Sequence, residues 1–360
     1  MMNLTEISNL RLINQKISLT ECKTPAEIVA WMGAMQAQDY SMVKWAIGLR
    51  LIDSTQEIVV RAINNCEIIR THLLRPTWHF VASEDIYWIL GLTSPHIKSL
   101  TKSRNRDLEL SDEILRKSAG IIENSLSEVS HFTREELAAE FNRTGIRTDS
   151  NRLSHLILEA ELNGLICNGP VIANKHTYAL LNKRVFNKKL LTKDESLAEL
   201  AKRYFTSHCP ATLKDFIWWS GLSVINARQA LDSIKTNFIS ENIGNETYWF
   251  KNSFKDAKIC KNSVHLLPAY DEYLISYKDR SASLSLTDNR KAVSNNGIFR
   301  PVIVVDGQVA GLWKRIVKKD KIIIEINLFK PTNKMIESQL LNIAEIYGKF
   351  FDKETVIKVL

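Results

Sequence analysis

Two glutamines, Gln36 and Gln38, lie one residue apart in the apolar stretch "MGAMQAQDYSMVKWAIGLR" (residues 32–50). Three further polar or titratable side chains follow them closely: Asp39, Tyr40 and Lys44. A neutral amide does not titrate, so it cannot serve as a strong general base. It can hold a water molecule, because it donates and accepts hydrogen bonds at the same time. Positioning of this kind is sufficient where the leaving group is already activated.

Hydrolysis of the glycosidic bond to a cationic alkylated purine is a reaction of that type. The positively charged base leaves readily, so no strong acid is needed. The enzyme has to stabilise an oxocarbenium-like sugar and place a water molecule on its far face.

The two amides can share a substrate only in one backbone conformation. In a helix, Gln36 and Gln38 would point about 200° apart. In an extended segment, residues i and i+2 point the same way. The helix that starts at the capping box Thr24–Glu27 must therefore end near Met35, with Ala37 facing the core. The alternative is a continuous helix with a polar surface, and periodicity does not decide between the two.

The chain of 360 residues is 45% hydrophobic, which is enough for a sizeable core and two or three domains. No apolar run approaches the roughly 18 residues of a membrane span, and the N-terminus lacks the features of a signal peptide. We therefore expect a cytoplasmic protein. The five cysteines form no C-x-x-C pair, so we expect small buried hydrophobes and neither a metal nor a cofactor.

The net charge is +8 and the isoelectric point is near 9.1, which is compatible with a polyanionic partner. Basic residues cluster at 102–106, 182–193 and 313–321. One such cluster is usually a solvated face, but three of them beside the modules described below favour DNA. The candidate DNA-binding residues are Lys183, Arg184, Lys188, Lys189, Lys314 and Arg315.

The predicted elements indicate an α+β protein with tandem winged-helix modules. Two helices come first, one over 4–17 and one that starts at Thr24. A helix at about 55–65 follows, and then two strands at 67–74 and 77–82. A helix followed by a β-hairpin is the winged-helix pattern. A capping box at Thr133 begins a second copy, and a third copy starts at Thr212, about 70–80 residues further on; each ends in a hairpin.

The last hundred residues change character. The runs 263–277, 300–316 and 321–329 are strand-like, and Asp306-Gly307 predicts a hairpin turn. We expect a β-barrel or curled sheet closed by a helix over 333–351. Four domains are predicted. Residues 1–110 form a helical, winged-helix module that carries the Gln-x-Gln motif, residues 111–190 and 191–255 each form a winged helix, and residues 256–360 form a barrel-like domain.

No nucleotide-binding P-loop, dinucleotide-binding glycine motif, zinc-protease motif or serine-hydrolase elbow is present in the sequence. The sequence does resemble a known family. "MGAMQAQDYSMVKWAIGLR" is similar to the signature of AlkZ-like, winged-helix DNA glycosylases, whose hallmark is Gln, an aliphatic residue and Gln. Three further blocks match in order: "THLLRPTWHFVASEDIYWIL", "LLPAYDEYLISYKDR" and "PVIVVDGQVAGLWKR".

This resemblance implies three winged helices and a β-barrel around a basic cleft, and a monomeric, monofunctional glycosylase. Its substrate would be double-stranded DNA with N7-alkylated purines, and some relatives unhook interstrand cross-links. The motif transfers onto Gln36 and Gln38 as the residues that position the hydrolytic water. Another branch has Asp at the second position, so Gln38 resembles the cross-link-associated branch.

Other residues transfer with less specific roles. Asp39 is the nearest carboxylate and could stabilise the oxocarbenium, although a helix cap is the simpler role. Thr77 and His79 match a Thr-x-His block and could line the cleft. For Asp271 and Arg280 we expect an internal ion pair, and for Trp45 and the Trp218-Trp219 pair a place in the core.

Two alternatives from other classes stay open. Winged helices most often only bind DNA, so a non-catalytic regulator or damage sensor would use the same modules. A protein-interaction module is the other alternative, and the basic clusters argue mildly against it.

Overall fold

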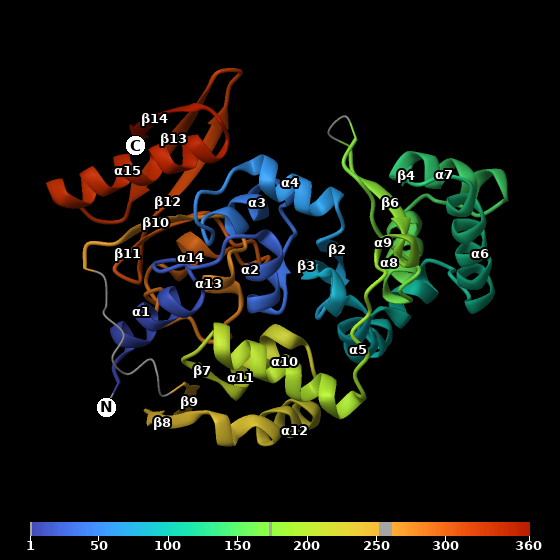
Figure 1. Cartoon of the computed structure of the whole chain (residues 1–360), viewed down its shortest axis with the longest axis horizontal. Helices are drawn as coiled ribbons and strands as arrows, with labels where there is room; N and C mark the ends of the chain where they lie inside the picture. Colours follow the sequence, from blue (N-terminus) through green and yellow to red (C-terminus); the bar gives the residue numbers. More distant parts are fainter. Residues whose placement is uncertain (1, 173–174, 252–260) are drawn as a thin grey trace.

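The computed structural model describes residues 2–172, 175–251 and 261–360 (Figure 1). Cys260 and the predicted domain boundary at 255/256 lie outside these residues. The chain forms three helical units with small sheets and a larger C-terminal sheet, and is therefore α+β as expected.

The first unit follows the predicted order of helices and strands. Thr24 caps α2 through a full capping box with Glu27, and Pro25 occupies the first helical position. Thr55 caps α4. The elements are α1 (Leu4–Asn14), α2 (Pro25–Met32), β1 (Met35–Gln36), α3 (Tyr40–Gly48), α4 (Gln56–Asn64), β2 (Ile68–Leu73) and β3 (Thr77–Ala82).

The second and third units repeat this order of short strand, two helices and hairpin, so the three are tandem winged-helix modules. Their sheets have the orders β1-β3-β2, β4-β6-β5 and β7-β9-β8. The second unit contains β4 (Phe132–Thr133), α7 (Arg134–Arg143), α8 (Arg152–Leu162), β5 (Ile166–Asn168) and β6 (Thr177–Leu180). The third contains β7 (Ala211–Thr212), α11 (Leu213–Ser220), α12 (Val224–Ile234), β8 (Ile239–Ile243) and β9 (Glu246–Phe250).

Helices between the units were not predicted from the sequence. They are η1 (Ser83–Asp85), α5 (Ile86–Asp107), α6 (Asp112–Glu128), α9 (Leu181–Arg184) and α10 (Lys193–Ser207). The third unit itself contains a further short helix, η2 (Lys235–Asn237), between α12 and β8. The predicted boundary at 110 falls between α5 and α6, and the one at 190 falls between α9 and α10. The division into domains remains a prediction.

The C-terminal region forms one five-stranded, curled sheet with the order β10-β11-β12-β13-β14. Asp306-Gly307 makes the predicted turn between β11 and β12. The elements are β10 (Val264–Leu267), α13 (Glu272–Ile275), α14 (Asn289–Ala292), β11 (Val302–Val305), β12 (Gln308–Val317), β13 (Lys321–Leu328), α15 (Lys334–Phe350) and β14 (Glu354–Val359).

Two expectations for this region were wrong. The run 263–277 is a strand only over β10, because the Asp271 side chain accepts the Tyr273 N–H and starts helix α13. The closing helix α15 is present, but it does not end the fold. After it the chain adds β14 in parallel to β13, with Glu354 opposite Lys321.

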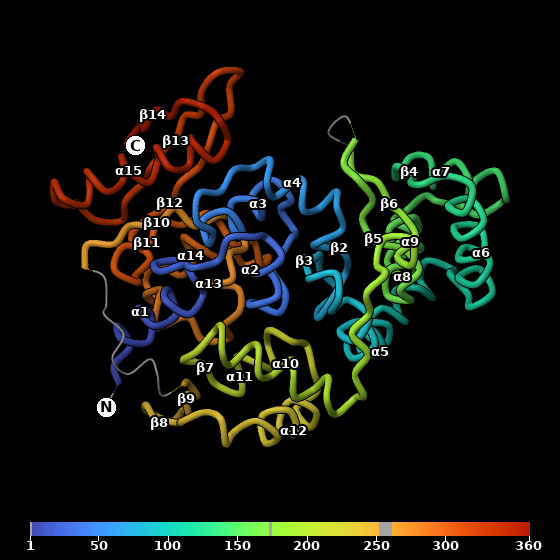
Figure 2. The backbone as a smooth tube through the Cα atoms, in the orientation of Figure 1, coloured from blue at the N-terminus to red at the C-terminus, as the bar shows by residue number. Residues whose placement is uncertain are grey.

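The cores show which units belong together. One core joins α2, α3 and α4 of the first unit to the C-terminal sheet and α15. A second joins β2, β3 and α5 to the third unit. The second unit has largely its own core and lies to one side of the molecule (Figure 2). The first unit, which carries the two glutamines, is therefore held from two sides.

Candidate active site

Helix α2 ends at Met32, before Gln36, so the two glutamines do not lie on one continuous helix. Gly33 terminates this helix with φ of 79°, a conformation that favours glycine. The chain then runs extended through β1, where Gln36 lies opposite His79 of β3. Ala37 continues the pairing by donating its N–H to the Trp78 carbonyl at 2.7 Å.

The first unit departs from the other two at this point. In the second and third units the last residue of the short strand, Thr133 or Thr212, is itself the cap of the next helix. In the first unit three residues, Ala37, Gln38 and Asp39, separate the end of β1 from the start of α3. The Gln-x-Gln motif therefore spans a short insertion into an otherwise repeated module.

The backbone around Ala37 is held by residues from three other segments. The Gln36 N–H donates to Glu272 Oε1 at 2.5 Å. The Ala37 carbonyl accepts from Arg70 Nε and Nη2 at 3.1 and 2.9 Å. Arg70 itself lies 4.1 Å from the Trp78 ring centroid. A segment with its polar groups engaged in this way keeps its side chains in fixed directions.

The side chains of the motif have different environments. Ala37 is fully buried in the core, as expected. Gln36 is 5% exposed, and its Oε1 accepts a hydrogen bond from Thr77 Oγ1 at 3.2 Å. Gln38 is exposed to solvent. One amide is thus anchored, and the other is open to a ligand.

Thr77 and His79 both lie beside Gln36. His79 Nδ1 is 3.0 Å from the Thr77 carbonyl, to which it donates. Burial, helped by the charge of Arg75, lowers the pKa of His79 to about 3, so the ring is neutral at physiological pH. Its buried Nε2 has no hydrogen-bond partner within the described residues.

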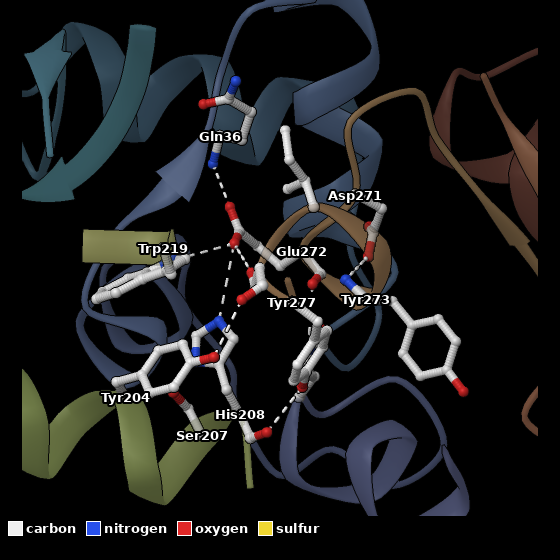
Figure 3. Close-up of polar contacts among 12 residues, drawn as sticks. Gln36, Tyr204, Ser207, His208, Trp219, Asp271, Glu272, Tyr273 and Tyr277 are labelled. Atoms are coloured by element: carbon white, nitrogen blue, oxygen red, sulfur yellow. Dashed lines mark hydrogen bonds and ion pairs between the residues drawn. The ribbon is translucent and has the colours of Figure 1, made fainter. Parts of the chain in front are cut away.

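Glu272 lies directly behind the Gln-x-Gln strand and was not singled out from the sequence (Figure 3). Its Oε1 accepts the Gln36 N–H, and its Oε2 accepts hydrogen bonds from Trp219 Nε1 at 3.2 Å and from Ser276 Oγ. Burial acts to raise the pKa of this carboxyl, but His208, Ser276 and the Gln36 N–H lower it to about 2. Glu272 is therefore a buried, ionised carboxylate.

His208 is the neighbour of Glu272 on the side away from Gln36. Its Nε2 lies 3.7 Å from Glu272 Oε2, and both side chains are buried. Burial lowers the pKa of His208, whereas its hydrogen bond to Glu272 and the charge of that carboxylate act to raise it. The hydrogen bond between Glu272 and the Gln36 N–H could not have been predicted from a local sequence pattern, because the two residues lie 236 positions apart.

Asp39 is the N-cap of α3. Its carboxylate accepts the N–H groups of Ser41 and Met42, both at 3.0 Å. Arg315 reaches the same helix start from β12, donating to Ser41 Oγ at 2.8 Å. Lys44, one turn further along, lies 4.9 Å from the Tyr40 ring centroid, and burial together with Arg315 lowers its pKa.

Of the other predicted DNA-binding residues, several are engaged with the protein itself. Lys183 donates to two carbonyls at the end of α6, and Arg184 Nη2 donates to the Ile63 carbonyl at the end of α4. Lys189 and Lys314 pair with glutamates at 3.2 and 2.7 Å. Lys188 lies 4.3 Å from the Tyr87 ring centroid.

The remaining expectations concern structural residues. Trp45 and Trp219 are buried, as expected, whereas Trp218 is half-buried. Asp271 does form an internal ion pair, but its partner is Arg50 at 2.7 Å. Arg280 instead donates Nε to the Leu274 carbonyl at 2.8 Å.

Cys167 and Cys209 are buried thiols, whereas Cys22 and Cys66 are half-buried, so the cysteines are less uniformly buried than expected. Across the part of the chain that the structure describes, His, Cys, Asp and Glu nowhere gather in a group that could hold a metal ion. None of the helices described there is long and apolar enough to cross a bilayer.

Comparison with known proteins supports one family. The model of the family described as "DNA glycosylase AlkZ-like" matches residues 29–350. An "Interstrand DNA cross-link repair glycosylase" from Streptomyces sahachiroi is 22% identical over 345 residues, covering 90% of this chain and 91% of that protein. The solved structure of Streptomyces sahachiroi DNA glycosylase AlkZ superposes with a TM-score of 0.84 at 20% identity, covering all of both chains. The match to the family model spans most of the chain, and the protein therefore belongs to the AlkZ-like DNA glycosylase family.

Proposed function

We propose that this protein is a monofunctional DNA glycosylase that hydrolyses the N-glycosidic bond of N7-alkylated purines in double-stranded DNA. Gln36 and Gln38 place the attacking water. The observation that carries the proposal is the non-helical Gln36–Gln38 segment, in which the backbone is held by Glu272 and Arg70 and the Gln38 side chain is exposed.

The proposed chemistry suits these neutral residues. An N7-alkylated purine carries a positive charge and leaves as a neutral base, so the enzyme does not have to protonate it. The water needs a hydrogen-bond acceptor and a fixed direction of approach, and an amide supplies both. Thr77 holds the Gln36 amide in place, and His79 in turn donates to the Thr77 carbonyl.

Negative charge close to the motif supports the same step. The ionised Glu272 lies behind Gln36, and the Asp39 carboxylate directly follows Gln38. Both carboxylates are already hydrogen-bonded to backbone N–H groups. We therefore assign them electrostatic support of an oxocarbenium-like sugar rather than nucleophilic attack.

The proposal extends to interstrand cross-links made through N7 of purines, because the bond to be broken is the same. It includes action as a monomer in the cytoplasm, without a cofactor. A relative named for cross-link repair and Gln at position 38 support this wider substrate range.

The direct test is release of 7-methylguanine from alkylated duplex DNA by the wild type, Gln36→Ala and Gln38→Ala. The wild type should release the base and leave an abasic site without cutting the strand, and both variants should be impaired. Gln339→Ala, an exposed glutamine of α15, is the matched control and should retain full activity. An inactive wild type, or a fully active Gln38→Ala variant, contradicts the proposal.

The second candidate is a non-catalytic winged-helix DNA-binding protein. The burial of Gln36 and its bond to Thr77 favour it, because a purely structural glutamine would look the same. This candidate predicts salt-dependent DNA binding without base release. A regulator of this kind is also expected to be a dimer that binds half-sites one helical turn apart.

A further inference from the structure

Three cationic side chains gather around the half-buried ring of Trp218. Arg75 Cζ, Lys278 Nζ and Arg280 Cζ lie 5.4, 4.9 and 5.6 Å from the ring centroid. The ring itself is fixed, because Trp218 Nε1 donates to the Ile275 carbonyl at 2.8 Å. We call these four residues the Trp218 patch.

The cations of the Trp218 patch lack the acidic partners that other basic residues have. Within the described residues, Arg75, Lys278 and Arg280 form no ion pair at 4.0 Å or less. The Arg75 Nε is buried without any hydrogen-bond partner in that part of the chain. Three like charges this close repel one another, and none of them has a carboxylate at ion-pair distance within the described residues, so the arrangement is suited to an anion supplied from outside.

The nearby carboxylates are committed elsewhere. Asp215 accepts the N–H groups of Lys278 and Asp279 at 2.8 and 3.3 Å and also caps α11 at Thr212. It also lies 3.8 Å from Arg11. Glu272 is occupied by Gln36, Trp219 and Ser276, as described above. Both still act on the patch at longer range, because Glu272 acts to raise the pKa of Arg75 and Asp215 acts to raise that of Arg280, but neither forms an ion pair with a patch cation.

Burial has the largest effect on Arg280 and lowers its pKa. The charge of Asp215 acts to raise it, that of Arg75 lowers it, and that of Asp279 raises it. The pKa of Arg280 is nevertheless about 10, so the group stays charged at neutral pH. The patch thus presents three positive charges over the whole physiological range.

The Trp218 patch is continuous with the candidate active site on three elements. Arg75 precedes Thr77 by two residues, Trp218 is followed by Trp219, and Lys278 and Arg280 follow α13, which carries Glu272. Gly221 allows the close approach of α11 to the β2–β3 turn. A Cβ at this position would lie 2.6 Å from the Leu74 carbonyl oxygen.

We propose that Arg75, Lys278 and Arg280 bind a backbone phosphate of the DNA strand whose nucleotide lies at Gln36 and Gln38. This inference rests on the proposed function for the identity of the anion. A guanidinium offers parallel N–H donors to a phosphate, and Lys278 adds an exposed point charge. The contact fixes the strand beside the water-placing amides, and it carries no sequence information.

The test is the salt dependence of binding to undamaged duplex DNA between 50 and 200 mM salt, with the full chain. Each lost phosphate contact reduces the slope of log K against log salt by about 0.9. Because the three cations share one phosphate, Lys278→Gln and Arg280→Gln should each shrink the affinity ratio between the two salt concentrations, by at most about 3.5-fold. Arg280→Lys keeps the charge and should keep the wild-type slope.

Lys235→Gln is the matched control, because Lys235 is exposed and already paired with Asp232 at 2.9 Å. Its slope should equal that of the wild type. Wild-type slopes for both Lys278→Gln and Arg280→Gln overturn the inference, as does a wild type that does not bind DNA. Lys278 is exposed, so its variant gives a result even if Arg280→Gln fails to fold.

The readout is independent of base release. A wild type that binds through the Trp218 patch but releases no 7-methylguanine contradicts only the proposed function. A wild type that releases the base while the patch variants keep the wild-type slope contradicts only the patch.

Discussion

Replacing Glu272 by Gln should weaken the fold at the point where the C-terminal region supports the motif. Gln has nearly the same shape but no charge. The pKa of Glu272 falls from its ordinary value of 4.5 to about 2 in the folded protein. That difference corresponds to about 3 kcal/mol of stability at pH 7, which the variant should lose.

The loss should depend on pH in a defined direction. A carboxyl group with a depressed pKa in the folded state stabilises the protein above its unfolded pKa. The contribution disappears as the pH falls through the folded pKa. The stability difference between wild type and Glu272→Gln should therefore be full above pH 5, fall to less than half by pH 3 and nearly vanish at about pH 2.

Urea unfolding of both proteins between pH 3 and pH 7 measures this difference. Amide hydrogen exchange adds a local readout, because the Gln36 N–H loses a charged acceptor and should exchange faster in the variant. Glu123→Gln, on the exposed face of α6, is the control and should change stability by no more than about 0.5 kcal/mol. A Glu272→Gln deficit that is the same at pH 3 and pH 7 would refute the reasoning.

Three further predictions concern the residues around the motif. Asp39→Ala should cost about 1 kcal/mol in urea unfolding because α3 loses its cap, whereas Asp39→Asn should cost clearly less; equal losses would show that capping is not the role. Thr77→Val frees the Gln36 amide and should slow 7-methylguanine release while DNA binding persists, whereas Thr77→Ser should retain the rate; a fully active Val variant argues against this positioning. The His79 ring should show no NMR titration between pH 5 and pH 8, since its pKa is about 3, and a transition in that range would contradict its burial as a neutral group.

The local elements were largely predictable because their signals are local. The predicted capping boxes at Thr24 and Thr133 each start a helix in the structure. The Asp306-Gly307 turn forms the expected hairpin. A cap or tight turn involves residues a few positions apart, so the sequence contains nearly all of the interactions that decide it.

Other segments could not be read in this way. The run after β10 has strand-like composition, yet Asp271 caps a helix there, and its carboxylate pairs with Arg50, 221 residues away. The basic cluster at 182–193 suggested DNA contacts. In the structure, Lys183 and Arg184 donate hydrogen bonds to free backbone carbonyls at the C-terminal ends of α6 and α4. Such bonds depend on which helix ends lie nearby in the fold.

The sequence by itself determined the identity of the motif and the capped helix that leads to it. Only the tertiary structure decided that Gln36 is buried while Gln38 is exposed, that Glu272 receives the Gln36 N–H, and that Arg75 meets Trp218. The physical reason is separation along the chain. A buried carboxylate or an unpaired guanidinium is defined by its neighbours, and here those neighbours come from elements that only packing brings together.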